Sequence, residues 1–383
     1  MIFDRKNLTN TQLLQFYRQL LWPRMIEEKM LVLLRQGKIS KWFSGIGQEA
    51  ISVGATLALD KDEWIMPLHR NLGVFTSREM PLHKLFLQWQ GTQQGYSKAR
   101  ERSFHFGSSA HHICGMISHL GPQLAIADGV ALAYQQRGQL KASMAFTGDG
   151  GTSEGDFHEA LNVAAVWNLP VIFIIENNGY GLSTPTNEQY KCDHLVDRAK
   201  GYGMEGIRID GNNILEVYQT VKGVRDYCIN QQKPYLIECD TFRMRGHEEA
   251  SGVKYVPKHL METWSLKDPI KNYEQFLVQE NVLTEMQVAE IRNRFKDQME
   301  ADLRKAMEPE TFEPSVAAEL ADVFAPVPAS TIPDYSLVET AQKTNKRFIE
   351  AISDALRQSM EKYPDMIIMG QDIAEYGGAF KIT

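Results

Sequence analysis

The middle of the chain alternates between short apolar segments and helical segments, and this alternation constrains the fold more than any other feature. The helical segments 121–138 and 154–169 alternate with the strand-like segments 141–148 and 170–178. Strands and helices that alternate at this length form a parallel sheet with helices on both faces. We therefore predict an α/β fold with a doubly wound parallel sheet. The same alternation continues with a strand, a helix and a strand at 206–210, 214–231 and 234–243.

The remaining segments extend this core at both ends. Apolar residues at helical spacing predict an entry helix at 10–36, and a small, apolar helix packed against the sheet is predicted at 46–59. A strand and loop are expected at 64–73, and a charged amphipathic helix at 285–307. These segments complete the first of three predicted parts, residues 1–307.

The end of the chain has a different composition. Residues 312–336 are rich in Pro, Ala and Ser, which is typical of a linker, and we assign 308–345 to it. The tail 346–383 then reads as a helix at 346–364, a strand at 365–370 and a loop. One helix and one strand cannot bury a core alone. The tail is therefore predicted to be the opening of a second domain.

Charge and cysteine content exclude several classes of protein. Lys and Arg number 41 against 48 Asp and Glu, a net charge of −7, so no basic surface for nucleic acid or anionic membrane is expected. No run of about 18 uncharged apolar residues could span a bilayer. The four cysteines form no CxxC pair, and the first residues lack a secretory pattern. We expect a cytoplasmic protein.

Two polar loops follow neighbouring predicted strands. Gly148, Asp149, Gly150 and Gly151 come directly after the first strand, and the loop 177–180 comes directly after the second. One βαβ unit separates them, so both loops emerge at the edge where open α/β sheets bind ligands. Carboxylate and amide oxygens suit Mg²⁺, and glycine backbone can approach a phosphate. The pattern predicts a site for magnesium and a diphosphate, although each loop alone is also a common turn.

The combination resembles the thiamine diphosphate motif, and the stretch 148–190 resembles the α subunit of 2-oxo acid dehydrogenase E1 components. The likeness extends from about Leu13 to Met307. It implies the thiamine diphosphate-binding fold, with thiamine diphosphate and Mg²⁺ as cofactors. It further implies that Asp149, the side chain of Asn178 and the backbone carbonyl of Tyr180 bind the metal.

Further positions carry over from the resemblance. Arg70 stands where the family contacts the diphosphate, while His69 replaces the aromatic residue usual before it. Ser118 and Leu120 match positions that flank the aminopyrimidine ring. His247 matches a catalytic histidine that contacts diphosphate and substrate, a role that suits a group able to carry a proton near neutral pH. Glu248 replaces a serine that is phosphorylated in some relatives.

A histidine-rich stretch at 105–119 allows a different interpretation. A mixture of histidine and cysteine can bind zinc, but the paired spacing of a structural zinc site is missing. His105 matches a family histidine near the cofactor, and the others stay unassigned. The residues concerned are His105, His111, His112, Cys114 and His119.

The resemblance implies oxidative decarboxylation of a 2-oxo acid, of branched-chain or pyruvate type, with acyl transfer to a lipoyl-bearing E2 acyltransferase. The tail resembles the first part of the E1 β subunit, with Gln371 in place of an acidic residue, and ends before the segment that carries the family's activating glutamate. We therefore expect a fusion to a β-type domain, a homo-oligomer, and weak cofactor binding by this chain alone. The alternatives are transketolase-like carbon transfer and a scaffold that retains the fold without catalysis.

Overall fold

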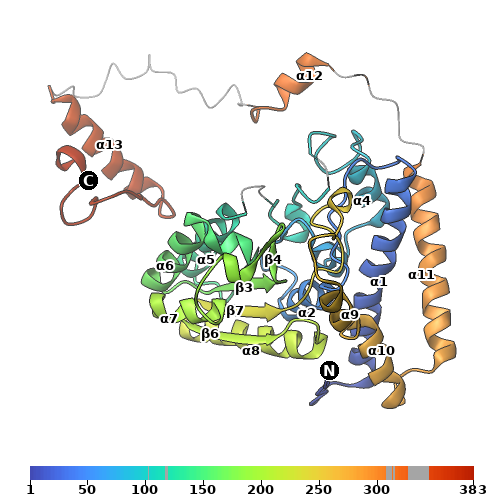
Figure 1. Ribbon diagram of the computed structural model, residues 1–383. Helices are drawn as coiled ribbons and strands as arrows, with labels where there is room; N and C mark the ends of the chain where they lie inside the picture. Colours follow the sequence, from blue (N-terminus) through green and yellow to red (C-terminus); the bar gives the residue numbers. More distant parts are fainter. Residues whose placement is uncertain (102, 117–119, 308–312, 314, 327–344) are drawn as a thin grey trace. The chain divides into compact units, whose positions relative to one another are not determined.

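The structure is a computed structural model that describes residues 1–383 except 102, 117–119, 308–312, 314 and 327–344 (Figure 1). The chain divides into two compact units, Met1–Phe312 and Glu313–Thr383. The first unit contains the predicted α/β core. Each unit is described by itself below.

A five-stranded parallel sheet forms the centre of the first unit, as the alternation predicts. Its order is β1-β2-β3-β7-β6, and every neighbouring pair is parallel. Apolar runs such as the Val-Ile-Phe-Ile-Ile segment of β3 are fully buried because helices cover both faces. The strands are β1 Ile65–Met66, β2 Ser143–Gly148, β3 Val171–Asn177, β6 Glu205–Asp210 and β7 Tyr235–Asp240.

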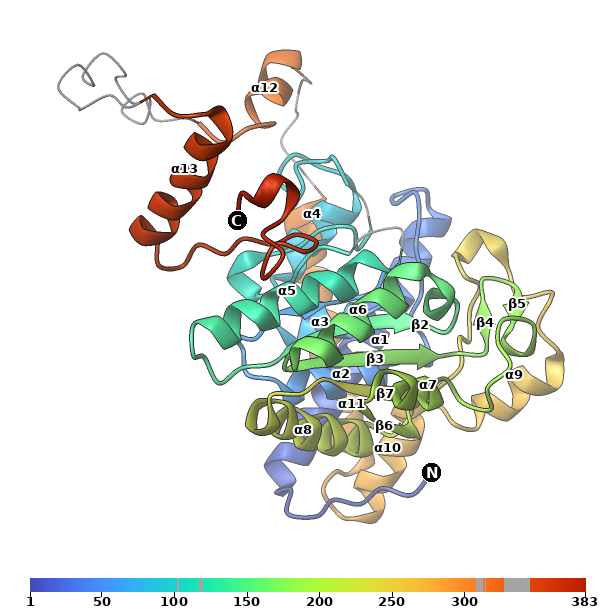
Figure 2. The ribbon, with the colours of Figure 1, turned by 90° about the vertical axis from the view of Figure 1, so that its left-hand side faces the viewer.

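Alternate side chains of the strands point to opposite faces and enter two separate cores. Phe146 and Ile174 belong to the core that includes residues of α2 and α8. Ala145 and Phe173 belong to the core that includes residues of α5 and α6. Figure 2 shows α5 and α6 on one side of the strands and α8 on the other. The prediction of a doubly wound sheet is therefore confirmed. These helices are α2 Glu49–Ala58, α5 Pro122–Gln136, α6 Gly155–Trp167 and α8 Ile214–Gln231.

Three further helices form an outer layer on the α2 side. Leu13, Tyr17 and Leu20 of the first helix pack with Ile270 and Tyr273 in a third core. The entry helix ends one residue before the predicted limit, while the helix expected at 46–59 is shorter and begins at Glu49. The outer helices are α1 Asn10–Arg35, α10 Pro269–Gln279 and α11 Glu285–Ala306. Shorter elements are α3 Leu72–Ser77, α4 Leu82–Trp89, α7 Arg198–Tyr202, α9 Lys258–Ser265, β4 Tyr180–Gly181 and β5 Thr184–Pro185.

The second unit contains helices α12 Val316–Ala321 and α13 Phe348–Lys362. The prediction of α13 is confirmed, whereas the strand predicted at 365–370 is wrong, because these residues form no strand. A strand needs a neighbour for its backbone hydrogen bonds. None pairs with this segment in the described part of the unit, and Met369 is 61% exposed. Among the described residues, no helix has the length and apolar character needed to cross a membrane.

Candidate cofactor site

The parallel register of β2 and β3 brings the two predicted loops together. Gly148 pairs with Glu176 at the ends of these strands, so Asp149 and Asn178 leave the sheet side by side. Asp149 is 1% exposed and Asn178 is 6% exposed. Both line one small cavity, which also reaches Arg70 and His247. The spatial prediction for the two loops is therefore confirmed.

The glycine loop continues the strand into a short 3₁₀ helix, Gly150–Ser153, and α6 begins at Gly155. A Cβ atom at Gly150 would lie 3.0 Å from the Cα atom of Gly181, and one at Gly151 would clash with the Thr147 hydroxyl. At Gly148, by contrast, no heavy atom of the described residues lies within 4 Å of that position. Close packing thus explains Gly150 and Gly151, while Gly148 leaves open space in which a phosphate could approach.

Asp149 is a buried carboxylate in this cavity. Burial raises its pKa above the ordinary value, and a hydrogen bond from Gln189 opposes the shift. The Gln189 amide Nε2 donates to Asp149 Oδ2 at 3.1 Å. Carboxylate oxygen that is removed from water is stabilised by a bound cation. The environment of Asp149 therefore fits a metal ligand.

The loop after β3 presents the other two predicted ligands. Gly179 has a φ of +84°, which favours glycine and turns the chain sharply. The Asn178 Oδ1 atom accepts a hydrogen bond from the backbone N–H of Tyr180 at 3.2 Å. The carbonyl of Tyr180 accepts from the Arg243 Nη1 atom at 3.4 Å. The oxygens of these two predicted ligands thus belong to the same turn. Arg243, which was not assigned from the sequence, lies next to them.

Arg70 is held rigidly beneath the cavity. It is 5% exposed, and its Nη1 atom donates to the Ser44 carbonyl at 2.9 Å. Its Nη2 atom lies 2.8 Å from His69 Nε2. Burial lowers the pKa of Arg70 to about 10, with Arg243 the next cause, so the guanidinium remains charged at neutral pH. A fixed, buried arginine suits bidentate binding of a phosphate.

His247 lies on the loop after β7 and lines the same cavity as the glycine loop. Its ring packs against Phe43 at 5.7 Å and His69 at 5.4 Å between centroids. Burial lowers its pKa to about 4, and the charges of Arg70 and Arg243 add to the shift. His247 is therefore neutral near pH 7 in the protein without an anion in the cavity.

The two residues predicted to flank the cofactor ring have different outcomes. Leu120 lines the cavity and adopts a φ of +61°, uncommon for leucine. Ser118 lies outside the described residues, so its position stays a prediction. Of the predicted cofactor residues, the structure thus gathers Arg70, Leu120, Gly148, Asp149, Gly150, Gly151, Asn178, Tyr180 and His247 around one cavity.

Several cavity residues were not predicted from the sequence. Glu176 is 1% exposed and accepts hydrogen bonds from Asn71 Nδ2 at 2.5 Å and Gln48 Nε2 at 3.0 Å. Its position two residues before Asn178, at the end of a buried strand, was the available signal. Arg243 lies four residues before His247 in the same loop, and this proximity in the sequence was the available signal. The cavity is also lined by Leu68, His69, Gly181 and Leu182.

The histidine-rich stretch forms no metal site in the part of it that the structure describes. His111 Nδ1 lies 2.7 Å from Ser108 Oγ, and His112 packs against Trp64 at 5.4 Å. Among the described residues of the chain, no group of three or more His, Cys, Asp or Glu side chains is placed to hold a metal. His119 lies outside those residues. The ligands predicted for Mg²⁺ are one aspartate, one asparagine and one backbone carbonyl, so this result does not bear on them.

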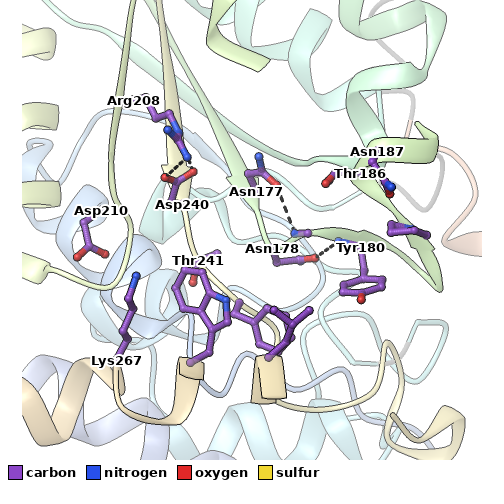
Figure 3. Close-up of a pocket in the computed structure, with 15 residues that line it drawn as sticks. Asn177, Asn178, Tyr180, Thr186, Asn187, Arg208, Asp210, Asp240, Thr241 and Lys267 are labelled. Atoms are coloured by element: carbon purple, nitrogen blue, oxygen red, sulfur yellow. Dashed lines mark hydrogen bonds and ion pairs between the residues drawn. The ribbon is translucent and has the colours of Figure 1, made fainter. Parts of the chain in front are cut away.

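A larger cavity of about 660 Å³ is also lined by the 177–180 turn (Figure 3). It shares Asn178 and Tyr180 with the candidate site. Its far wall carries Arg208, which pairs with Asp240 at 2.6 Å, and Lys267 projects from the opposite side. The turn that carries two of the three predicted metal ligands therefore lines both cavities.

Comparison with known proteins decides the family. The family model described as "Dehydrogenase E1 component" matches residues 17–315, most of the chain. This chain belongs to the dehydrogenase E1 component family. The family depends on thiamine diphosphate. In this member the buried Asp149 carboxylate, the buried Arg70 guanidinium and the open space beside Gly148 fit that cofactor.

Three relatives of this E1 family member illustrate the range of similarity. It is 34% identical over 323 residues to the 2-oxoisovalerate dehydrogenase subunit alpha of Bacillus subtilis, covering 82% of this chain and 95% of the relative. It is 32% identical over 342 residues to the mitochondrial 2-oxoisovalerate dehydrogenase subunit alpha 2 of Arabidopsis thaliana, covering 86% and 72%. The pyruvate dehydrogenase E1 component subunit alpha of Staphylococcus aureus is 32% identical over 302 residues, covering 78% and 79%. The chain is thus similar to α-type subunits of both classes.

Proposed function

We propose that this chain is the α-type part of an E1 component that decarboxylates a 2-oxo acid oxidatively with thiamine diphosphate and Mg²⁺. One observation carries the proposal. A single cavity at the carboxyl ends of β2 and β3 gathers a buried arginine, a buried carboxylate, an amide oxygen and a histidine. These are the groups that a metal-bound diphosphate and a reacting acid require.

Each group has a distinct role in this proposal. Asp149, Asn178 and the Tyr180 carbonyl hold Mg²⁺, and Arg70 binds the diphosphate. Thiamine diphosphate supplies, when bound, the carbon nucleophile and the electron sink for decarboxylation. His247 is half-buried and neutral near pH 7, so it can accept a proton or donate a hydrogen bond to the acyl group. An anion in the cavity would offset the arginine charges and favour the protonated ring.

The partners belong to the same proposal. α-type E1 subunits act with a β-type subunit and an E2 acyltransferase, and the chain contains no TPISE segment for the activating glutamate. The similarity of 346–383 to the start of a β subunit supports a fusion to a β-type domain. We also propose a homo-oligomer, since two chains or two domains build each site in the family. The four cysteines are unpaired, which supports a reducing, cytoplasmic location.

The substrate is proposed to be a small 2-oxo acid of the branched-chain or pyruvate type. Relatives named for 2-oxoisovalerate and for pyruvate match at 34% and 32% identity. One methylene in an apolar pocket changes binding by only about 1–3 kcal/mol, so the two acids need a direct comparison. Turnover of 2-oxoisovalerate and of pyruvate by the chain together with its β-type domain would rank them. Faster turnover of a ketose phosphate than of either acid would support transketolase-like transfer instead.

The metal site provides the decisive test. Calorimetry of the full chain with thiamine diphosphate should show binding that depends on Mg²⁺. The Asp149→Ala variant should lose that dependence, because one of the metal's charged ligands is gone. Asp193→Ala changes an exposed aspartate outside the cavity and serves as the control. Unchanged Mg²⁺-dependent binding in Asp149→Ala would show that the proposed site is misplaced.

A further inference from the structure

Gln189 connects the proposed metal ligand Asp149 to the small β4–β5 hairpin. Its amide Nε2 donates to Asp149 Oδ2 at 3.1 Å and to the Thr184 carbonyl at 2.9 Å. The Gln189 side chain also lies against the glycine contact between the two loops, 3.1 Å from the Cβ position of Gly181. One side chain therefore fixes both the orientation of the carboxylate and its distance from the hairpin.

The position of this hydrogen bond restricts how Asp149 can ligate a cation. An amide donor at Oδ2 competes with a metal for that oxygen, which disfavours a metal bond to both carboxylate oxygens at once. Mg²⁺ is small and octahedral and accepts one oxygen from each carboxylate, whereas Ca²⁺ takes six to eight ligands and often binds both oxygens of a carboxylate. A carboxylate with one oxygen already engaged suits Mg²⁺ better than Ca²⁺.

We propose that Gln189 is a positioning residue that holds Asp149 in a one-oxygen binding mode and thereby favours Mg²⁺ over Ca²⁺ in the cofactor site. The inference rests on the proposed function, because it takes Asp149 as a metal ligand. Gln189 does not touch the metal. It acts through the carboxylate that it orients, and it ties the geometry of that carboxylate to the hairpin.

Two variants test the role of Gln189 from different directions. Gln189→Met keeps the length of the side chain but removes the amide donor, so Asp149 Oδ2 becomes available to the metal. Gln189→Glu keeps the shape and adds a carboxylate, which supplies another anionic oxygen for a larger ion. In both variants the preference for Mg²⁺ over Ca²⁺ should fall by roughly three- to tenfold, the equivalent of one hydrogen bond. Glu188→Gln, an isosteric change at the exposed residue directly before Gln189, should leave the preference unchanged.

Calorimetry measures the binding of thiamine diphosphate to the full chain at increasing concentrations of MgCl₂ or of CaCl₂. The ratio of the two cation midpoints is the readout, since a merely structural role would weaken binding with both cations equally. An unchanged ratio in Gln189→Met and Gln189→Glu, or a parallel loss with both ions, would overturn the inference while leaving the proposed function standing. No cation-dependent binding in the parent chain would overturn both. Thermal unfolding shows which variants fold, and either variant suffices for the test.

Discussion

Arg70 places its Nη2 atom 3.5 Å from the Nδ1 atom of His247. The same nitrogen lies 3.4 Å from the His247 carbonyl, so the guanidinium approaches both ring and backbone. A cation at this distance disfavours a second positive charge on the ring. Burial contributes most to the low pKa of His247, about 4, and Arg70 contributes next. The arginine that suits the diphosphate therefore also keeps the histidine neutral in the cofactor-free protein.

Replacement of Arg70 by methionine should raise the pKa of His247 toward its ordinary value. The variant removes the nearby positive charge but keeps much of the burial, so the pKa should rise without reaching about 6.5. NMR titration of the His247 ring protons in the chain without added cofactor measures this pKa. Arg70→Lys retains a charge and should give a smaller rise. Equal pKa values in the parent and in Arg70→Met would show that the arginine does not control the histidine.

Alanine at Gly148 and at Gly150 should separate a binding role from a packing role. Gly148→Ala should fold with nearly unchanged stability but bind thiamine diphosphate more weakly, because the added methyl group enters open space. Gly150→Ala should instead destabilise the chain by roughly 1–3 kcal/mol, because its Cβ would press on the Gly181 backbone. Urea denaturation and cofactor calorimetry give the two quantities. Loss of stability in Gly148→Ala with normal binding would contradict this assignment.

Removal of the Glu27 carboxylate should destabilise the loop that supports Arg70. Glu27 accepts hydrogen bonds from Trp42 Nε1 at 2.6 Å and from the Gly45 backbone at 2.8 Å, in a buried position. Glu27→Ala leaves two buried donors without partners and should cost roughly 2–4 kcal/mol. Glu28→Ala changes an exposed neighbour on the same helix and should cost less than about 0.5 kcal/mol. Urea denaturation of both variants checks the difference.

The sequence predicted the sheet and the adjacency of the two polar loops because both depend on local patterns. A buried strand followed directly by Gly-Asp-Gly, and another followed by Asn-Asn-Gly, place their loops at one edge whatever the details of packing. The hydrogen-bond partners of Glu176 and Gln189 could not be predicted in this way. Their roles depend on partners 105 and 40 residues away, Asn71 and Asp149, and such contacts leave no periodic signal.

The wrong strand at 365–370 shows the limit of the same reasoning. Its Met-Ile-Ile-Met sequence has the composition of a buried strand, but composition describes a preference that a neighbouring strand must satisfy. The described residues of the second unit supply no such neighbour, and Ile367 is 45% exposed. The pattern therefore predicts what the segment would form in a complete sheet.

Asp128 should make the chain less stable as the pH rises. This aspartate of α5 is 4% exposed, and neither carboxylate oxygen has a hydrogen-bond partner among the described residues. Burial raises its pKa to about 8. Between about pH 4 and pH 8 the unfolded chain ionises Asp128 while the folded chain keeps the proton, so the free energy of unfolding falls with a slope of up to about 1.4 kcal/mol per pH unit.

Asp128→Asn replaces the carboxyl group by a neutral group of the same shape, which removes this contribution. Urea denaturation of the full chain at pH 5 and pH 8 should therefore show a smaller loss of stability in Asp128→Asn than in the parent. Asp297→Asn, at an exposed position of α11, is the matched control and should keep the parent's slope. A parent slope that Asp128→Asn leaves unchanged would show that the buried Asp128 carboxyl group does not cause this pH dependence.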